Sequence, residues 1–156
     1  MPASMDYCQG TKAMEINTFL QHQEKETENI TKVKEFYKAL NKGDRAVFKF
    51  LVDDPTWDVS PGWPDGGRYH GKVAVFGTFY KTLLNRLYHL LAEPEVYVDG
   101  GDIVTVLGFY NIVFHEGEPV VLVRFSHTWK IAADGRIAGV WQVADSSLVW
   151  ARLKAE

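Results

Sequence analysis

The sequence predicts an α+β domain in which helices come first and a curved antiparallel sheet follows. Apolar residues recur at three- and four-residue steps within 17–42 and again within 72–87, which is the spacing of one buried helix face. From residue 93 onward, runs rich in β-branched and aromatic residues alternate with glycine-containing turns, as in antiparallel strands. We therefore expect about three helices to pack on one face of the sheet.

The helices are expected to have recognisable ends. Thr18 and Gln21 form a candidate capping box at the start of the first helix, and Gly43 is a candidate stop signal at its end. Asp44 is placed to cap a second, short helix that runs to Leu51. A stretch rich in proline and glycine follows, which indicates a strand and then a loop before the third helix.

The second half of the chain is expected to form an antiparallel meander. Its strand segments are 93–101, 102–119, 120–131 and 136–153. Residues 103–114 are apolar on both faces, so this strand needs cover on both sides. Helices can cover one face, and a second copy of the chain is expected to cover the other, which predicts a homodimer.

The charge and cysteine content of the chain argue against several classes of function. The chain has 156 residues, of which 46% are apolar and 13% aromatic, and a net charge of −3. That charge gives no electrostatic basis for binding nucleic acid or an anionic membrane. The one cysteine, Cys8, excludes an internal disulfide, and the sequence predicts neither a metal site nor a cofactor. We expect residues 1–16 to form a flexible arm and 17–156 a single domain, in the cytoplasm because neither a signal peptide nor a membrane span is evident.

The side-chain alternation of the last two strands suggests a functional pair. His127 lies in the more apolar row of its strand, between Phe125 and Trp129. A tight hairpin would place it near Trp141, with Asp145 farther along the same row. A histidine and a desolvated carboxylate facing one hollow could move a proton next to a carbonyl group.

Four segments together resemble a known superfamily. They are "YKALNKGD" (37–44), "LVDDPTWDVSPG" (51–62), "YHGKVAVFGTFY" (69–80) and "DGRIAGVWQVAD" (134–145). Their order and spacing resemble the nuclear transport factor 2-like superfamily, which includes ketosteroid isomerase and the SnoaL-like polyketide cyclases. The resemblance covers about residues 28–153 and implies a cone-shaped domain, often dimeric, with a pocket between the concave sheet and the helices.

Within this superfamily the residues do not match ketosteroid isomerase. That enzyme needs a tyrosine on the first helix, an aspartate before a proline, and a neutral aspartic acid in a later strand. The corresponding positions hold Phe36, Ser60 and His127, so steroid isomerisation is not expected. The resemblance to SnoaL-like cyclases instead implies that Asp145 is an acid/base group beside His127.

Two functions therefore remain open from the sequence. One is an isomerase, cyclase or dehydratase that acts on a small hydrophobic carbonyl compound through His127 and Asp145. The other is a non-catalytic ligand-binding or dimerisation module, in which His127 is a satisfied core residue and Asp145 binds backbone at the end of its strand. In both cases the expected pocket residues are Phe36, Trp57, Ser60, Trp63, His70, Phe79, Tyr80, Tyr110, Phe125, Trp129 and Trp141.

Overall fold

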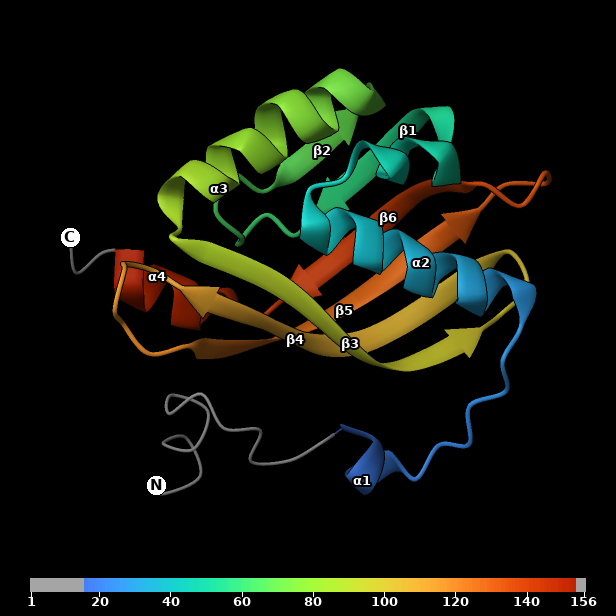
Figure 1. The fold of residues 1–156 in the computed structure, drawn as a ribbon, viewed down its shortest axis with the longest axis horizontal. Helices are drawn as coiled ribbons and strands as arrows, with labels where there is room; N and C mark the ends of the chain where they lie inside the picture. Colours follow the sequence, from blue (N-terminus) through green and yellow to red (C-terminus); the bar gives the residue numbers. More distant parts are fainter. Residues whose placement is uncertain (1–15, 154–156) are drawn as a thin grey trace.

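A six-stranded curved sheet forms the body of the protein. The computed structural model describes residues 16–153, and the predicted N-terminal arm lies outside this range except for Ile16. The strand order is β2-β1-β6-β5-β4-β3 (Figure 1). The strands are β1 (Leu51–Val59), β2 (Gly67–His70), β3 (His89–Asp99), β4 (Ile103–Val113), β5 (Val121–Ile131) and β6 (Ile137–Ala144).

The sheet is mixed, which corrects the expectation of a purely antiparallel one. Every neighbouring pair is antiparallel except β1 and β6, which run parallel. The meander from β3 to β6 is antiparallel because short turns connect its strands. No such turn joins β1 to β6, since residues 60–136 lie between them. The direction of β1 was therefore not fixed by local signals.

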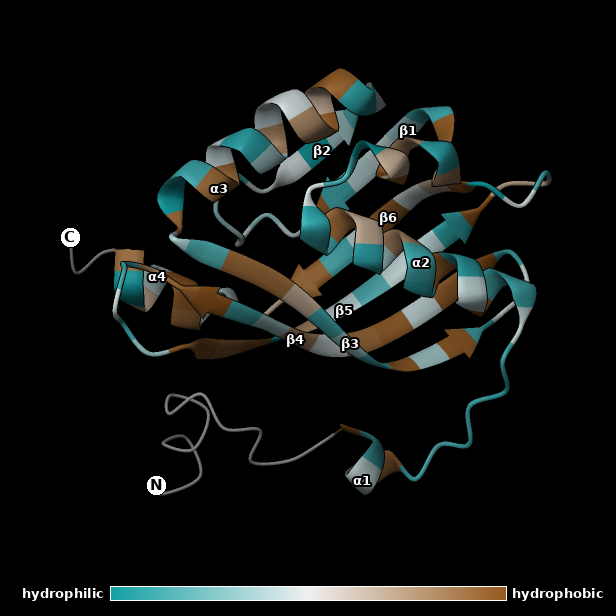
Figure 2. Ribbon diagram, viewed as in Figure 1, coloured by the Kyte–Doolittle hydropathy of each residue, from teal (hydrophilic) through white to brown (hydrophobic). Residues whose placement is uncertain are grey.

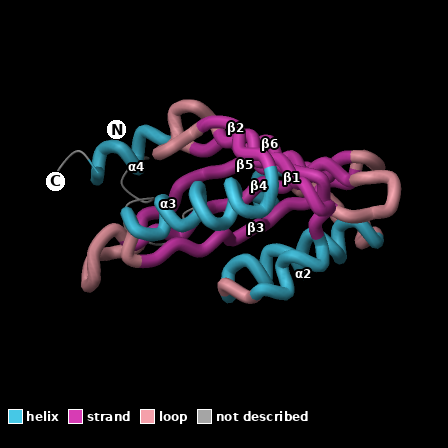
Figure 3. Tube along the Cα trace, turned by 90° about the horizontal axis from the view of Figure 1, so that it is seen from above, coloured by secondary structure: helices cyan, strands magenta, loops and turns pink. Residues whose placement is uncertain are grey.

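Helices cover the concave face of the sheet. They are α2 (Glu28–Lys42), the 3₁₀ helix η3 (Arg45–Phe50), the π-helical segment η4 (Val73–Tyr80) and α3 (Lys81–Arg86). Figure 3 shows α2 on one side of the strands. Figure 2 shows that hydrophobic and hydrophilic residues alternate along the strands. The buried face of α2 consists of Ile30, Val33, Phe36, Tyr37 and Ala39.

The first long helix begins later than the sequence predicted. A short helix α1 (Ile16–Leu20) ends before Gln21, whose φ of 52° is left-handed, and the chain is non-helical up to Thr27. Thr27 is the N-cap of α2, because its hydroxyl accepts the Ile30 N–H at 3.2 Å and donates to Asp99 at 2.7 Å. The Thr18–Gln21 capping box is therefore wrong.

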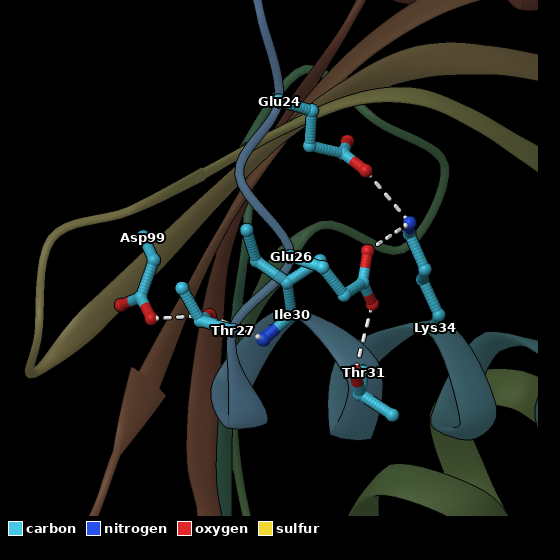
Figure 4. A network of polar contacts seen from close by, with 7 residues as sticks. All are labelled: Glu24, Glu26, Thr27, Ile30, Thr31, Lys34 and Asp99. Atoms are coloured by element: carbon cyan, nitrogen blue, oxygen red, sulfur yellow. Dashed lines mark hydrogen bonds and ion pairs between the residues drawn. The ribbon is translucent and has the colours of Figure 1, made fainter.

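Figure 4 shows the polar network around this start of α2. The Lys34 ammonium bridges the carboxylates of Glu24 and Glu26, at 2.7 and 2.9 Å. Glu26 also accepts the Thr31 hydroxyl. These contacts tie the extended segment before α2 to the first two turns of the helix and so fix where the helix enters the fold.

The predicted end of the helix at Gly43 and the predicted N-cap at Asp44 are confirmed. Gly43 has a φ of 65° and ends α2, and the Asp44 side chain accepts the Ala46 N–H at the start of η3. The last predicted strand is wrong beyond Ala144, because residues Ser146–Leu153 form helix α4 against β5.

A β-bulge interrupts the hairpin of β5 and β6. Ile131 pairs with Ile137 and Lys130 with Gly139, so Ala138 is an extra residue in β6. Gly139 lies close to the neighbouring strand, since a Cβ there would be 2.2 Å from the carbonyl oxygen of Thr56. The bulge is therefore held at a position where only glycine fits.

Candidate functional site

A largely apolar pocket of about 330 Å³ lies between the helices and the concave sheet and is partly open to solvent. This is within the range of small-molecule sites, at its lower end. The walls come from α2, η3, η4, α3 and the inward rows of β1, β3, β4, β5 and β6. The aliphatic and aromatic residues of the wall include Val47, Phe48, Trp57, Trp63, Phe76, Phe79, Leu83, Leu90, Tyr110, Trp129 and Val140.

The π-helical segment supplies much of the aromatic wall. Its wider turn places Phe76, Phe79 and Tyr80 along the cavity. The rings of Phe76 and Tyr80 stack at 5.5 Å, and Trp57 from β1 meets Tyr80 through a 3.0 Å hydrogen bond from its indole N–H. This wall is apolar and aromatic, with the Tyr80 hydroxyl as a polar group.

His127 is the centre of a buried hydrogen-bond network. It is 6% exposed, and both of its ring nitrogens contact tyrosine hydroxyls. Nδ1 lies 2.6 Å from the Tyr37 hydroxyl, and Nε2 lies 2.6 Å from the Tyr110 hydroxyl. Trp129 donates its indole N–H to Tyr37 at 2.9 Å, and Gln142 donates its amide N–H to Tyr110 at 3.3 Å.

The network is neutral near physiological pH. Burial lowers the pKa of His127 to about 3, because a buried imidazolium would lose its hydration. Burial likewise raises the pKa of Tyr80 to about 12 and raises the pKa of Tyr110 well above its usual value. His127 is thus a neutral imidazole held between two protonated tyrosines, and not an imidazolium cation that could act as a general acid.

Most of the pocket residues expected from the sequence lie at the cavity. Trp57, Trp63, Phe79, Tyr80, Tyr110, His127 and Trp129 line it directly. Phe36 and Phe125 are buried just behind the wall: Phe36 packs on Trp129 at 5.0 Å between ring centres, and Phe125 stacks on His127 at 4.0 Å.

Four expected residues lie elsewhere. Ser60 does not line the cavity, although its backbone N–H binds the side-chain oxygen of Gln142 at 3.1 Å. His70 is exposed and contacts Thr56 on the β1–β2 edge. Trp141 and Asp145 are also exposed, on the opposite side of β6 from the cavity, and Asp145 accepts the Ser147 hydroxyl at 2.7 Å.

The expectation that Asp145 and His127 share a pocket is therefore wrong, and the bulge is the reason. A one-residue shift of register exchanges the two faces of a strand. His127 pairs with Gln142 and not with Trp141. The row that contains Val140 and Gln142 faces inward, while the row of Trp141 and Asp145 faces outward.

Sequence reasoning missed two polar residues of the wall. Gln142 is 5% exposed and bridges Ser60 and Tyr110. Asn41, near the end of α2, binds both backbone groups of Ala92 through its amide. The sequence contains no clear signal for Gln142, because the two alternating rows of side chains in β6 are similar in composition. Only the bulge determines which row faces the cavity.

Fold and cavity define a class of protein: small α+β domains in which helices close a cavity against a curved sheet. A family model for the SnoaL-like domain matches residues 33–140. The chain belongs to this family, which is part of the nuclear transport factor 2-like superfamily. No curated protein sequence matches the chain.

Solved structures show the same fold. TerC, co-crystallised with polyporic acid, is 18% identical, with a TM-score of 0.73 over 82% of this chain and 99% of that one. A nuclear transport factor 2-like protein of unknown function from Burkholderia pseudomallei is 23% identical, with a TM-score of 0.72 over 82% and 98%. A protein named as a SnoaL-like polyketide cyclase from Shewanella denitrificans is 15% identical, with a TM-score of 0.69 over 84% and 100%.

Within residues 16–153, no group of three or more His, Cys, Asp or Glu side chains is arranged to hold a metal ion. Over the same residues, no helix is long and apolar enough to cross a bilayer.

Proposed function

We propose that this protein binds a small, largely apolar organic molecule in the cavity behind α2 and η4. The observation that carries the proposal is an aromatic-walled pocket of about 330 Å³ that is partly open to solvent and has a few fixed polar groups. A core that served packing alone would close such a space, because protein interiors are normally packed to high density. The structure of TerC with polyporic acid supports the idea that a related fold accommodates a small organic compound.

Binding is better supported than proton abstraction by a carboxylate. The expected base, Asp145, is on the other side of the sheet. The carboxylate at the cavity rim, Asp44, is exposed and is occupied in capping η3. His127 is neutral and held by two tyrosines. The isomerase or cyclase hypothesis was based on His127 and Asp145 acting together, and these two residues do not share the cavity.

Two variants of the same strand test the proposal. Val140→Phe fills the cavity from its wall, whereas Val143→Phe adds the same bulk to the exposed face of β6. The probe is N-phenyl-1-naphthylamine, whose fluorescence rises in apolar surroundings. We expect the wild type and Val143→Phe to bind it with similar affinity and Val140→Phe to bind it at least about tenfold more weakly, a change of about 1.4 kcal/mol.

Thermal unfolding of both variants checks that they are folded. Equal probe binding by a folded Val140→Phe variant would show that the probe binds outside the cavity and would contradict the proposal.

A further inference from the structure

The hydrogen bonds around the cavity determine which polar atoms remain available inside it. Asn41 uses both its N–H and its oxygen on the backbone of Ala92. Gln142 uses its oxygen on the Ser60 N–H, which fixes its amide N–H toward Tyr110. The indole N–H groups of Trp57 and Trp129 are bound to tyrosine hydroxyls.

The protons of the His127 network can be arranged in two ways. If Nδ1 carried the proton, the Tyr37 hydroxyl would accept from both His127 and Trp129. Its own O–H would then have no acceptor among the described residues, in a side chain that is 2% exposed and away from the cavity. An unsatisfied buried donor is costly. Hence Tyr37 donates to Nδ1, and the proton of His127 is on Nε2.

This assignment leaves one hydroxyl of a cavity-lining residue without an acceptor. With the proton on Nε2, the Tyr110 hydroxyl accepts from both His127 and Gln142. Its two lone pairs are therefore occupied, and its own O–H has no acceptor among the described residues. Because Tyr110 lines the cavity, that O–H is available to a bound molecule. Burial raises the pKa of Tyr110, so the hydroxyl stays protonated and remains a donor.

Tyr80 repeats the pattern on the opposite wall. Its hydroxyl accepts the Trp57 indole N–H at 3.0 Å, and its own O–H has no acceptor among the described residues. The charged residues that line the cavity, Asp44, Arg45 and Lys81, are exposed. Among the tyrosines of the wall, Tyr80 and Tyr110 each have an O–H that is free to donate to a bound molecule.

We propose that Tyr110, oriented by His127 and Gln142, is the ligand-anchoring donor and that the ligand class is an apolar ring compound with a carbonyl oxygen. This inference rests on the proposed function. A carbonyl oxygen accepts hydrogen bonds without bringing a proton that needs its own acceptor. Phenols and amines of the same shape bring such a proton into an apolar wall, which costs free energy.

The test uses two probes of nearly equal shape, fluorenone and fluorene, of which only fluorenone has a carbonyl group. Binding is followed by quenching of tryptophan fluorescence, and the bound carbonyl by isotope-edited infrared spectroscopy of ¹³C-labelled fluorenone. In the wild type we expect the carbonyl stretch to lie below its frequency in an alkane solvent. In Tyr110→Phe we expect it to move back toward the alkane value, with fluorenone affinity about three- to tenfold weaker and fluorene affinity unchanged.

Tyr97→Phe is the matched control. Tyr97 is a buried tyrosine that packs on Tyr37 but does not line the cavity, so this variant should retain the wild-type carbonyl frequency. The ¹⁵N shifts of His127 in the unliganded wild type provide a second measurement that needs no variant. We expect the Nε2–H tautomer, and the Nδ1–H tautomer would overturn the assignment.

The outcomes separate the two proposals. Fluorene and fluorenone binding with an unshifted carbonyl band would overturn the donor role of Tyr110 and leave the proposed function standing. Failure of both compounds to bind the wild type would overturn both. If Tyr110→Phe does not fold, the wild-type carbonyl band and the His127 tautomer still decide the inference.

Discussion

His127 makes the stability of the fold depend on pH within a defined window. Burial lowers the pKa of His127 to about 3 in the folded protein, whereas a histidine in an unfolded chain titrates near about 6.5. Between these values the unfolded chain takes up a proton that the folded protein does not. The free energy of unfolding is therefore undiminished above pH 6.5 and falls as the pH is lowered below it.

The size of the effect follows from the same two values. From pH 7 to pH 5 the unfolded state gains about 2 kcal/mol from protonation of this one histidine. For a domain of this length that loss corresponds to a melting temperature lower by about 4–8 °C. Carboxylates with lowered pKa values contribute mainly below this window, so the range from pH 7 to pH 5 isolates the histidine.

Thermal and urea unfolding at pH 7, 6 and 5 measure the slope. His127→Gln replaces the imidazole by an amide that takes up no proton, so its stability should fall by about 2 kcal/mol less over this range than that of the wild type. His89→Gln, at an exposed histidine, should keep the wild-type slope. Equal slopes for wild type and His127→Gln would refute the reasoning, as would an NMR titration in which His127 protonates near pH 6.

Three further outcomes are expected. Tyr37→Phe should lower the free energy of unfolding, measured in urea, by about 2–4 kcal/mol, because it leaves the Trp129 indole without an acceptor and His127 Nδ1 without a donor. A loss below about 1 kcal/mol would contradict the hydrogen-bond network around His127. Asp145→Asn should bind N-phenyl-1-naphthylamine as the wild type does, because its carboxylate is exposed, and weakened binding would show that this residue reaches the cavity. We propose that two copies of the chain form a homodimer through the outer face of the sheet, where Trp141 is 56% exposed. The Trp141→Glu variant should then sediment as a monomer. A wild-type protein that is monomeric at micromolar concentration would refute this proposal.

The end of α2, the start of η3 and the aromatic wall could be predicted from the sequence because their signals are local. Gly43 and Asp44 stop one helix and cap the next through contacts with residues a few positions away. The rings of Phe79 and Tyr80 lie on a helical face whose spacing is visible in the sequence, although the segment is π-helical.

The polar part of the site could not be predicted because it depends on one non-local event. The extra residue Ala138 shifts the pairing of β5 with β6, and a one-residue shift changes which row of β6 faces inward. Alternation alone made Trp141 and Asp145 partners of His127, whereas the partner is Gln142. The parallel pairing of β1 with β6 fixes the bulge through Gly139, and that pairing joins residues more than 80 positions apart.

The bulge also means that β6 carries two alternating rows of side chains, either of which could line the cavity, and that the position of the extra residue selects one of them. In the present frame the strand offers the cavity a valine and an amide, Val140 and Gln142. If the extra residue lay beyond Asp145, the other row would face inward, and the same stretch would offer the cavity an indole and a carboxylate, from Trp141 and Asp145. Site chemistry could therefore diverge among proteins of this fold by migration of one inserted residue, before any cavity side chain is substituted.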